Sequence, residues 1–228
     1  MIKRILLFIV LSVVFFTMVF SIAAILRSPS FRVKEVIVEG NLQPENQIQL
    51  TTLISPFAQK NLFRVQLNSL QSAIQQLPWV SEAEVKRIWP DKIVINLVDQ
   101  MPIVAWNTDQ VLNVYGEILP KEAFSQAQVT VLPQFFGDDD SSIKMLDYYQ
   151  QMNRILQSLN VKVKTLRLTE DQTWQVELDN GIILYLGDEQ ILTRLQRFVR
   201  VYPNVVSTHK KQPYSIDLRY AHGMAVRW

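Results

Sequence analysis

The most constraining feature of the chain is an apolar segment near its N-terminus. Residues 5–26 form a run of about 22 residues without a charged side chain, and a helix rising about 1.5 Å per residue over that length matches a bilayer core of about 30 Å. Lys3 and Arg4 precede the run and Arg27 follows it, so cations lie at both of its ends. The segment predicts a transmembrane helix at 5–26, with a short tail at 1–4 and a linker at 27–30.

A cleaved secretory signal is the alternative interpretation of this segment. Ser21-Ile22-Ala23 has the small-x-small spacing that signal peptidases accept. The apolar run continues through Ile25 and Leu26 and exceeds the usual signal core of about 7 to 15 residues, which favours a retained helix. The cations on the two sides of the run are nearly balanced, so the positive-inside rule does not decide which side of the membrane the rest of the chain faces.

Composition excludes several classes of function for the remaining residues. The 23 Lys and Arg residues are nearly balanced by 21 Asp and Glu residues, and no basic stripe with interleaved aromatic residues is present, so nucleic-acid binding is not expected. The chain has no cysteine, which excludes disulfides, thiolate zinc sites and iron–sulfur clusters. The part beyond the apolar run is long enough for two small domains.

The first domain is expected at residues 31–100 with the element order β-α-α-β-β. A strand ends at Gly40-Asn41, and two helices follow, one beginning at Pro44 and one over about 67–77. Residues 80–99 alternate between apolar and polar side chains around Trp89-Pro90-Asp91, which predicts a hairpin. The two helices can cover one face of a three-stranded sheet.

The second domain is expected at residues 101–228 as a β-rich unit with two packing helices. Apolar residues recur at helical spacing over 142–159 and again over 191–202, where Pro203 is expected to end the helix. The clearest hairpin lies at 174–186, where Asn180-Gly181 is expected to supply two positive-φ positions. Two further strands are expected near the C-terminus, at 214–220 and 224–228. The whole chain is thus predicted to be an α+β protein behind a single N-terminal transmembrane helix.

Several short motifs in this order resemble the FtsQ/DivIB cell-division family, and those of the first domain resemble its POTRA domain. The motifs are Val38-Glu39-Gly40-Asn41, Asn61-Leu62-Phe63, Leu77-Pro78-Trp79-Val80, Arg87-x-Trp89-Pro90, Pro102-x-x-Ala105-Trp106 and, at the C-terminus, Asp217-Leu218-Arg219-Tyr220-x-x-Gly223-x-Ala225-Val226-x-Trp228. Each motif alone is weakly specific, but their order behind one apolar segment makes the combined resemblance specific. It covers essentially the whole chain.

The resemblance implies a non-enzymatic protein of the bacterial divisome without a cofactor. It implies a single-pass inner-membrane protein with a cytoplasmic N-terminus and a periplasmic bulk, located at the division septum. The expected partners are FtsB and, through it, FtsL. Such a protein links early, mainly cytoplasmic division proteins with later periplasmic ones. The family often has a longer cytoplasmic tail than residues 1–4, so contacts made by such a tail are not expected here.

Two other classes of function remain open at this point. A POTRA-bearing component of protein export or outer-membrane assembly usually carries tandem POTRA domains or a long β-barrel, and this chain shows neither pattern. A membrane-anchored cell-wall hydrolase would need catalytic groups. Asp138-Asp139-Asp140 could hold a metal ion or transfer protons, but the run precedes a predicted helix, where carboxylates favour the positive end of the helix dipole. His209 and His222 are the only histidines, and no nucleophile motif accompanies them.

The last strand carries the physical argument for protein docking. Met224, Val226 and Trp228 alternate with polar or small residues at the end of the chain, where a strand is expected to form a sheet edge. Such an edge is either covered within the fold or completed by a strand of a partner. Tyr220 and Trp228 are the expected anchors, because aromatic residues dominate interface hot spots.

Three further residues belong to the predicted docking surface. Arg194 and Arg197 recur with Arg200 at every third position of the helix over 191–202, where a basic row is either a solvated face or a surface for an acidic partner. Trp174, at the start of the hairpin, is the last candidate. No catalytic, cofactor or metal site is predicted.

Overall fold

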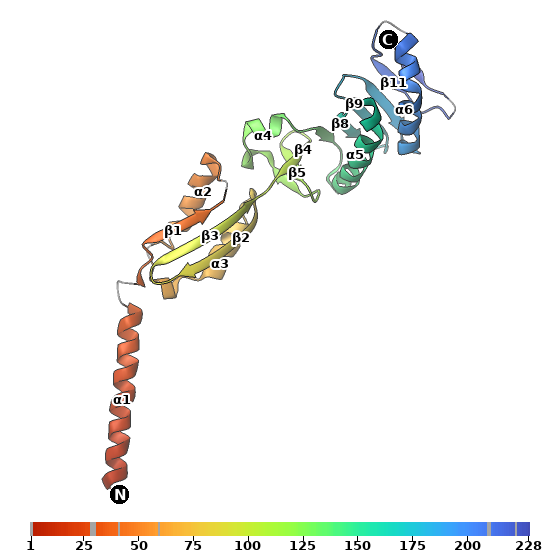
Figure 1. Ribbon diagram of the computed structural model, residues 1–228. Coiled ribbons are helices and arrows are strands. Elements are labelled where there is room, and N and C mark those ends of the chain that lie inside the picture. The colour runs from red at the N-terminus through yellow and green to blue at the C-terminus, as the bar shows by residue number, and fades with distance from the viewer. Residues whose placement is uncertain (1, 28–30, 41, 59, 209–210, 222) are drawn as a thin grey trace. The chain divides into compact units, whose positions relative to one another are not determined.

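The computed structural model of the protein describes residues 2–27, 31–40, 42–58, 60–208, 211–221 and 223–228 (Figure 1). The chain divides into two compact units, Met1–Gln100 and Met101–Trp228, and each is described by itself.

The first helix, α1, runs from Ile2 to Arg27. The sequence predicts a membrane-spanning helix at 5–26. Within the described residues, no helix reaches the combination of length and apolar character that crossing a membrane requires. The predicted span is therefore not confirmed by the structure.

The remainder of the first unit contains a three-stranded sheet in the order β1-β3-β2. Strand β1 (Glu35–Glu39) pairs parallel with β3 (Lys92–Asp99), which pairs antiparallel with β2 (Val80–Ile88). The β2–β3 pair confirms the predicted hairpin at 80–99, with the turn at residues 89–91. Because β1 and β3 are parallel, the start of β1 lies at the same end of the sheet as this turn.

Two helices complete this unit. Helix α2 (Pro44–Ile54) and helix α3 (Leu67–Gln75) are joined through the short 3-10 helix η2 (Leu62–Arg64), and α3 packs on β2. The apolar side chains facing inward are buried, as the expected amphipathic pattern requires, and they include Leu50, Ile54, Leu70, Ile74, Ile93 and Ile95. The β-α-α-β-β order expected from the sequence is confirmed.

The second unit is built on one nine-stranded mixed sheet in the order β12-β11-β10-β9-β8-β7-β4-β5-β6. Most neighbours are antiparallel, and the parallel pairs are β4–β7, β7–β8 and β10–β11. The strands are β4 (Pro102–Trp106), β5 (Gln110–Asn113), β6 (Ile118–Pro120), β7 (Gln134–Phe136), β8 (Val163–Leu168), β9 (Trp174–Leu178), β10 (Ile183–Gly187), β11 (Ser215–Asp217) and β12 (Ala225–Arg227).

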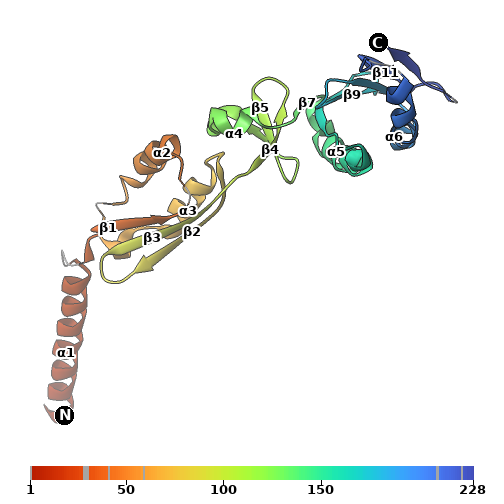
Figure 2. The same ribbon diagram turned by 45° about the horizontal axis from the view of Figure 1, so that its top comes forward.

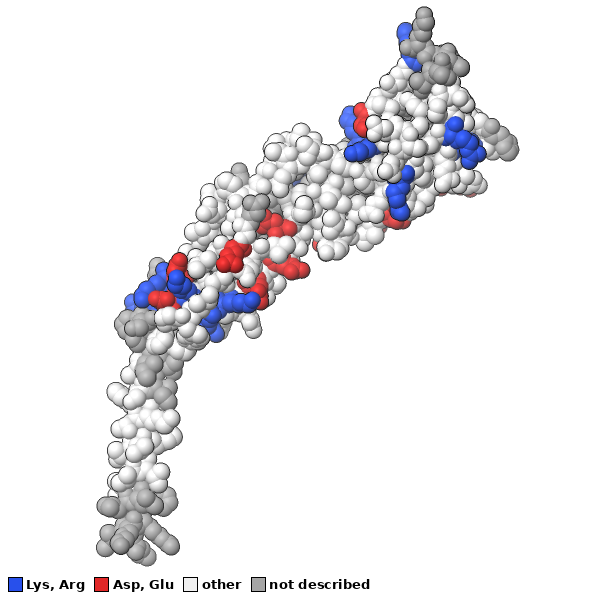
Figure 3. All heavy atoms as spheres, in the orientation of Figure 1, with Lys and Arg blue, Asp and Glu red and all other residues white. Residues whose placement is uncertain are grey.

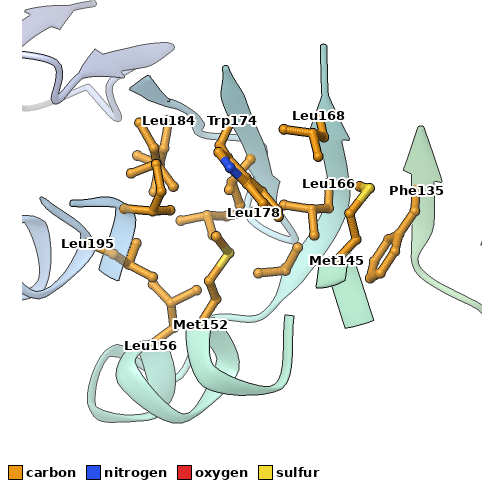
Figure 4. Packing of buried hydrophobic residues seen from close by; sticks show 14 of the residues in the cluster. Phe135, Met145, Met152, Leu156, Leu166, Leu168, Trp174, Leu178, Leu184 and Leu195 are labelled. Carbon is orange, nitrogen blue, oxygen red and sulfur yellow. The ribbon is translucent and has the colours of Figure 1, made fainter. Parts of the chain in front are cut away.

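Two long helices pack against this sheet and against each other. They are α5 (Ser142–Leu156), which contacts β8, and α6 (Ile191–Thr208), which contacts β10. Buried side chains of both helices and of the central strands form one continuous core, seen in Figure 4 around Met152, Leu166, Leu178 and Leu195. The predicted pair of packing helices is confirmed. A short helix, α4 (Gln126–Thr130), begins with a capping box between Ser125 and Gln128. This helix was not predicted from the sequence.

The turn between β9 and β10 differs from the prediction. Gly181 has φ +88°, but Asn180 is not among the described residues with positive φ. The N–H of Gly181 donates to the Leu178 carbonyl, and the N–H of Leu178 donates to the Ile182 carbonyl. This is the pattern of a three-residue loop in which one left-handed glycine follows a turn, so only Gly181 needs the left-handed region. The prediction of two positive-φ positions is wrong.

The end of α6 also differs. Pro203 lies inside the helix, which continues to Thr208. Proline removes one N–H donor, but its fixed φ near about −65° is itself helical, so the chain can continue past it with one hydrogen bond fewer. The predicted helix end at Pro203 is wrong.

Candidate protein-docking edge

The last strand of the chain, β12, lies at one edge of the nine-stranded sheet, next to the C-terminus in Figure 2. It pairs antiparallel with β11, where Val226 lies opposite Ile216. Within the described residues no strand pairs with its other side. This confirms that the C-terminal strand is a sheet edge, and such a strand presents backbone N–H and C=O groups to a further strand.

The register across β10, β11 and β12 places their side chains in two kinds of row. One row joins Leu184, Ile216 and Val226, of which Leu184 and Ile216 are fully buried and Val226 packs partly against the core. The adjacent row runs from Tyr185 to Asp217, its neighbour on β11, and on to Ala225, the neighbour of Asp217 on β12. Successive residues of a strand point to opposite faces, so this second row lies on the face away from the core.

The predicted anchors Tyr220 and Trp228 expose 58% and 41% of their surface, which is enough for contact with a partner. Met224 and Val226 are partly buried and pack against the core cluster, so each has both a structural contact and an open side. Val226 belongs to β12, and the other three residues lie before or after that strand in the sequence. Their binding of a partner stays a prediction.

Two exposed tyrosines near this edge were not predicted from the sequence. Tyr214 precedes β11 and exposes 58% of its surface, and its N–H donates to the carbonyl of Arg227 at 2.8 Å. Tyr185 on β10 exposes 36%. The alternation of buried Leu184 and Leu186 around Tyr185 was the available signal, because a strand buried on one face presents the intervening residue on the other.

Trp174 does not belong to the docking surface. Only 3% of it is exposed, and its ring lies 4.6 Å from the ring of Tyr148, between centroids, in the core shown in Figure 4. Strand β9 has neighbours on both sides, and Trp174 points to the face that α5 covers. The prediction that Trp174 contacts a partner is wrong, because almost none of its surface is open to a partner. Its place in the middle of the sheet depends on strand order, which local sequence does not contain.

Arg197 binds the connection between β11 and β12. Its guanidinium donates to the carbonyl of Ala221 at 2.6 Å, to that of Leu218 at 2.7 Å and to that of Tyr220 at 2.8 Å. A planar guanidinium can serve several acceptors at fixed angles, which a point charge cannot do. Arg197 therefore holds the segment from which Tyr220 projects.

Arg194 has a similar role next to β10. Its Nη1 donates to the carbonyl of Leu186 at 2.5 Å. The prediction of a basic row formed by Arg194 and Arg197 needs correction, because both guanidinium groups bind backbone carbonyls of their own unit. Of the three arginines, Arg194 and Arg197 are half-buried and Arg200 is exposed.

Asp217 and Arg219 form an ion pair on the open face beside the edge. The Arg219 guanidinium donates to both Asp217 carboxylate oxygens, the shortest distance being 2.6 Å from Nη2 to Oδ2. This hydrogen bonding lowers the pKa of Asp217 below its ordinary value of 3.8, against the opposing effect of burial. The carboxylate is therefore ionised at neutral pH and fixes Arg219 beside β11.

In the run of carboxylates at 138–140, Asp139 has a structural role in the second unit. Asp139 accepts a hydrogen bond of 2.9 Å from the indole Nε1 of buried Trp106. In the part of the chain that the structure describes, no group of three or more His, Cys, Asp or Glu residues could hold a metal ion. His209 and His222 lie outside the described residues.

The two units together define a class of protein. One unit has the β-α-α-β-β order of a POTRA domain, and the other is a mixed β unit that ends in an open strand edge. This is an architecture suited to docking other polypeptides, since main-chain pairing at a sheet edge is a general mode of peptide recognition.

Comparisons with known proteins identify the family. Residues 31–100 match the profile of the POTRA domain, FtsQ-type, and residues 104–219 match that of the cell division protein FtsQ/DivIB, C-terminal. A cell division protein FtsQ of Shewanella oneidensis is 34% identical over 196 residues, which is 86% of this chain and 74% of that protein. The corresponding Coxiella burnetii protein is 32% identical over 79% of this chain and 73% of its own length. The Escherichia coli protein of that name is 34% identical over 71% of this chain and 60% of its own length.

The chain belongs to the FtsQ/DivIB family of bacterial cell division proteins. The resemblance expected from the sequence motifs is thereby confirmed. The family match supports a role in the divisome, and the relatives are named for cell division rather than for a catalysed reaction.

Proposed function

We propose that β12 receives a strand of FtsB and that the chain engages FtsL through FtsB at the division septum. The observation that carries this proposal is the side of β12 that has no strand partner within the described residues. A strand added there would continue the nine-stranded sheet through main-chain hydrogen bonds, which supply affinity with little dependence on sequence.

Side chains around the edge would supply specificity. Tyr220 and Trp228 present large, partly exposed aromatic surfaces next to β12, and aromatic residues are enriched at interface hot spots. Arg197 favours binding indirectly, because it holds the carbonyls of Leu218, Tyr220 and Ala221 and so keeps residues 218–221 in one conformation.

The proposed location is the inner membrane, in single-pass form with the N-terminus in the cytoplasm and both units in the periplasm. The uncharged run at 5–26, within α1, supports an anchor of this kind. In this position the chain would link early, mainly cytoplasmic division proteins with the later periplasmic ones.

Capture of FtsB by the full-length chain tests the docking surface. Tyr220→Ala and Trp228→Ala are each expected to weaken binding about 30-fold or more, which corresponds to about 2 kcal/mol for a hot-spot aromatic residue. Tyr115→Ala is the matched control, since Tyr115 is 71% exposed and lies in the β5–β6 turn at the other end of the sheet. Unchanged FtsB binding by both edge variants would refute the proposed surface, and loss of folding would place these residues in the core.

A second pair of variants tests whether the backbone itself pairs. The N–H groups of consecutive residues in a strand alternate between its two sides, so of Val226 and Arg227 one donates towards β11 and the other outward. Proline at the outward position should abolish FtsB binding with little change in melting temperature, and proline at the other should destabilise the unit. Retention of binding by both proline variants would show that FtsB does not add a strand here.

A further inference from the structure

Three aromatic rings meet at one end of the first unit. Phe31, Phe63 and Trp89 have ring centroids 4.7 to 6.3 Å apart, with Phe63 closest to Trp89. Trp89 belongs to the β2–β3 turn, and Phe31 lies just before β1, so the cluster is at the end of the sheet where β1 and β3 begin. We call these three residues the tip cluster.

The tip cluster is open to solvent. Trp89 exposes 53% of its surface and Phe63 exposes 41%, and the adjacent Ile88 exposes 49%. Rings that only closed the end of a hydrophobic core would be largely buried, as Trp79 of the same unit is at 1%. Aromatic pairing stabilises the cluster itself but leaves this apolar surface uncovered.

The residues that flank the tip cluster in the sequence include more Lys and Arg than Asp and Glu. The carboxylates of Glu35 and Asp91 are each paired with a lysine, Lys92 and Lys34 respectively. Arg32, Lys60 and Arg64 are exposed, and no carboxylate in the described part of the chain forms an ion pair with them. Figure 3 shows Lys and Arg side chains gathered at this end of the unit.

The tip cluster is also tethered closely to α1. Phe31 follows Arg27, the last residue of α1, by four residues, which can span at most about 14 Å even when fully extended. The polar layer on each side of a bilayer core of about 30 Å is only about 5 to 8 Å thick. If α1 is the membrane anchor, Phe31 cannot move far from the headgroup layer.

We propose that the tip cluster docks onto the anionic phospholipid surface of the membrane that holds α1. Tryptophan side chains favour the interface between headgroups and hydrocarbon, and Lys and Arg residues without an ion-pair partner are attracted to anionic headgroups. Docking would fix the orientation of the three-stranded sheet on the membrane. The inference rests on the proposed anchoring of α1, and its test separates the two.

The absence of cysteine from the chain provides the assay. A single Ile88→Cys substitution accepts a spin label beside Trp89, and Val98→Cys accepts one near the far end of β3, about 20 Å along the strand from its start. The full-length labelled chain is reconstituted into vesicles of phosphatidylcholine with or without phosphatidylglycerol. Flotation reports whether the chain is anchored, and collisions with oxygen and with a water-soluble nickel chelate report the depth of the label.

The label at residue 88 is expected to be shielded several-fold from the nickel chelate in vesicles that contain phosphatidylglycerol, whereas the label at 98 remains aqueous. Trp89→Glu should return the label at 88 to water, and the matched Val98→Glu should not. Arg64→Glu keeps all three rings and should weaken docking only in anionic vesicles, so it tests the inference even if Trp89→Glu fails to fold.

Each contrary result has a distinct meaning. A chain that does not float with vesicles refutes the anchor and, with it, this inference. A chain that floats while the label at 88 stays aqueous refutes lipid docking and leaves the anchor intact. Shielding that appears only when another division protein is added would assign the tip cluster to a protein partner and overturn the inference.

Discussion

Replacing Arg197 by lysine keeps the positive charge of α6 but removes the planar guanidinium. In the structure that group donates three hydrogen bonds, of 2.6, 2.7 and 2.8 Å, to the carbonyls of Ala221, Leu218 and Tyr220. A lysine ammonium at the same position is a point donor that cannot reach all three carbonyls at once. The substitution therefore distinguishes a structural clamp from a charge that meets an acidic partner.

The size of the effect follows from these contacts. A hydrogen bond to a charged group contributes about 1.5 to 3 kcal/mol, but the loss is smaller where water can replace the donor. Tyr220 and Ala221 are exposed, whereas Leu218 is fully buried, so the loss falls mainly on one carbonyl. We expect Arg197→Lys to destabilise the second unit by about 2 kcal/mol, which corresponds to a fall of roughly 6 to 10 °C in its melting temperature for a unit of this size.

Calorimetry of the full-length chain and titration with FtsB provide the two measurements. Arg197→Lys is expected to lower the melting temperature and also to weaken FtsB binding, because residues 218–221 lose the hydrogen bonds that fix their conformation. Arg200→Lys is the control, since Arg200 is an exposed residue of the same helix. If Arg197→Lys kept both the melting temperature and FtsB binding, the proposed positioning role would be refuted, and simple charge attraction would be the better explanation.

Two further predictions concern stability. Trp174→Ala should cost about 3 to 5 kcal/mol in urea unfolding, because a 3% exposed indole leaves a cavity in the core, and a loss below about 1 kcal/mol would contradict its assignment to the core. Asp217→Asn should be more destabilising at neutral pH than in acid. The folded-state pKa of Asp217 lies below 3.8, chiefly through the hydrogen bond from Arg219, so its stabilising effect is present above 3.8 and is lost as the pH falls through the folded value. Unfolding measured at about pH 7 and about pH 3 checks this, and an equal difference between Asp217→Asn and the natural chain at both values would be inconsistent with it.

Local patterns in the sequence were sufficient for most elements of the fold. The β2–β3 hairpin, helix α5 and the β9–β10 hairpin each follow from periodicity and turn residues within a short window. The errors arose where a local preference was weaker than its context. Pro203 does not end α6, and Asn180 does not adopt a positive φ.

The docking edge was only partly predictable from the sequence. The alternating pattern at 224–228 predicted an edge strand, and Tyr220 and Trp228 were identified from their proximity to it. The roles of Arg194 and Arg197 were not predictable, since a helical row of arginines looks the same whether the guanidinium groups face water or bind carbonyls of a distant segment.

The sequence by itself determined the apolar run, the alternating and helical segments and the family, because these depend on neighbouring residues and on motif order. The tertiary structure decided which strands lie side by side. Strand β11 reaches β10 only through α6, and the resulting order buries Trp174 in the middle of the sheet while leaving β12 at its border. Strand order is set by packing between segments far apart in the chain, and no local pattern contains that information.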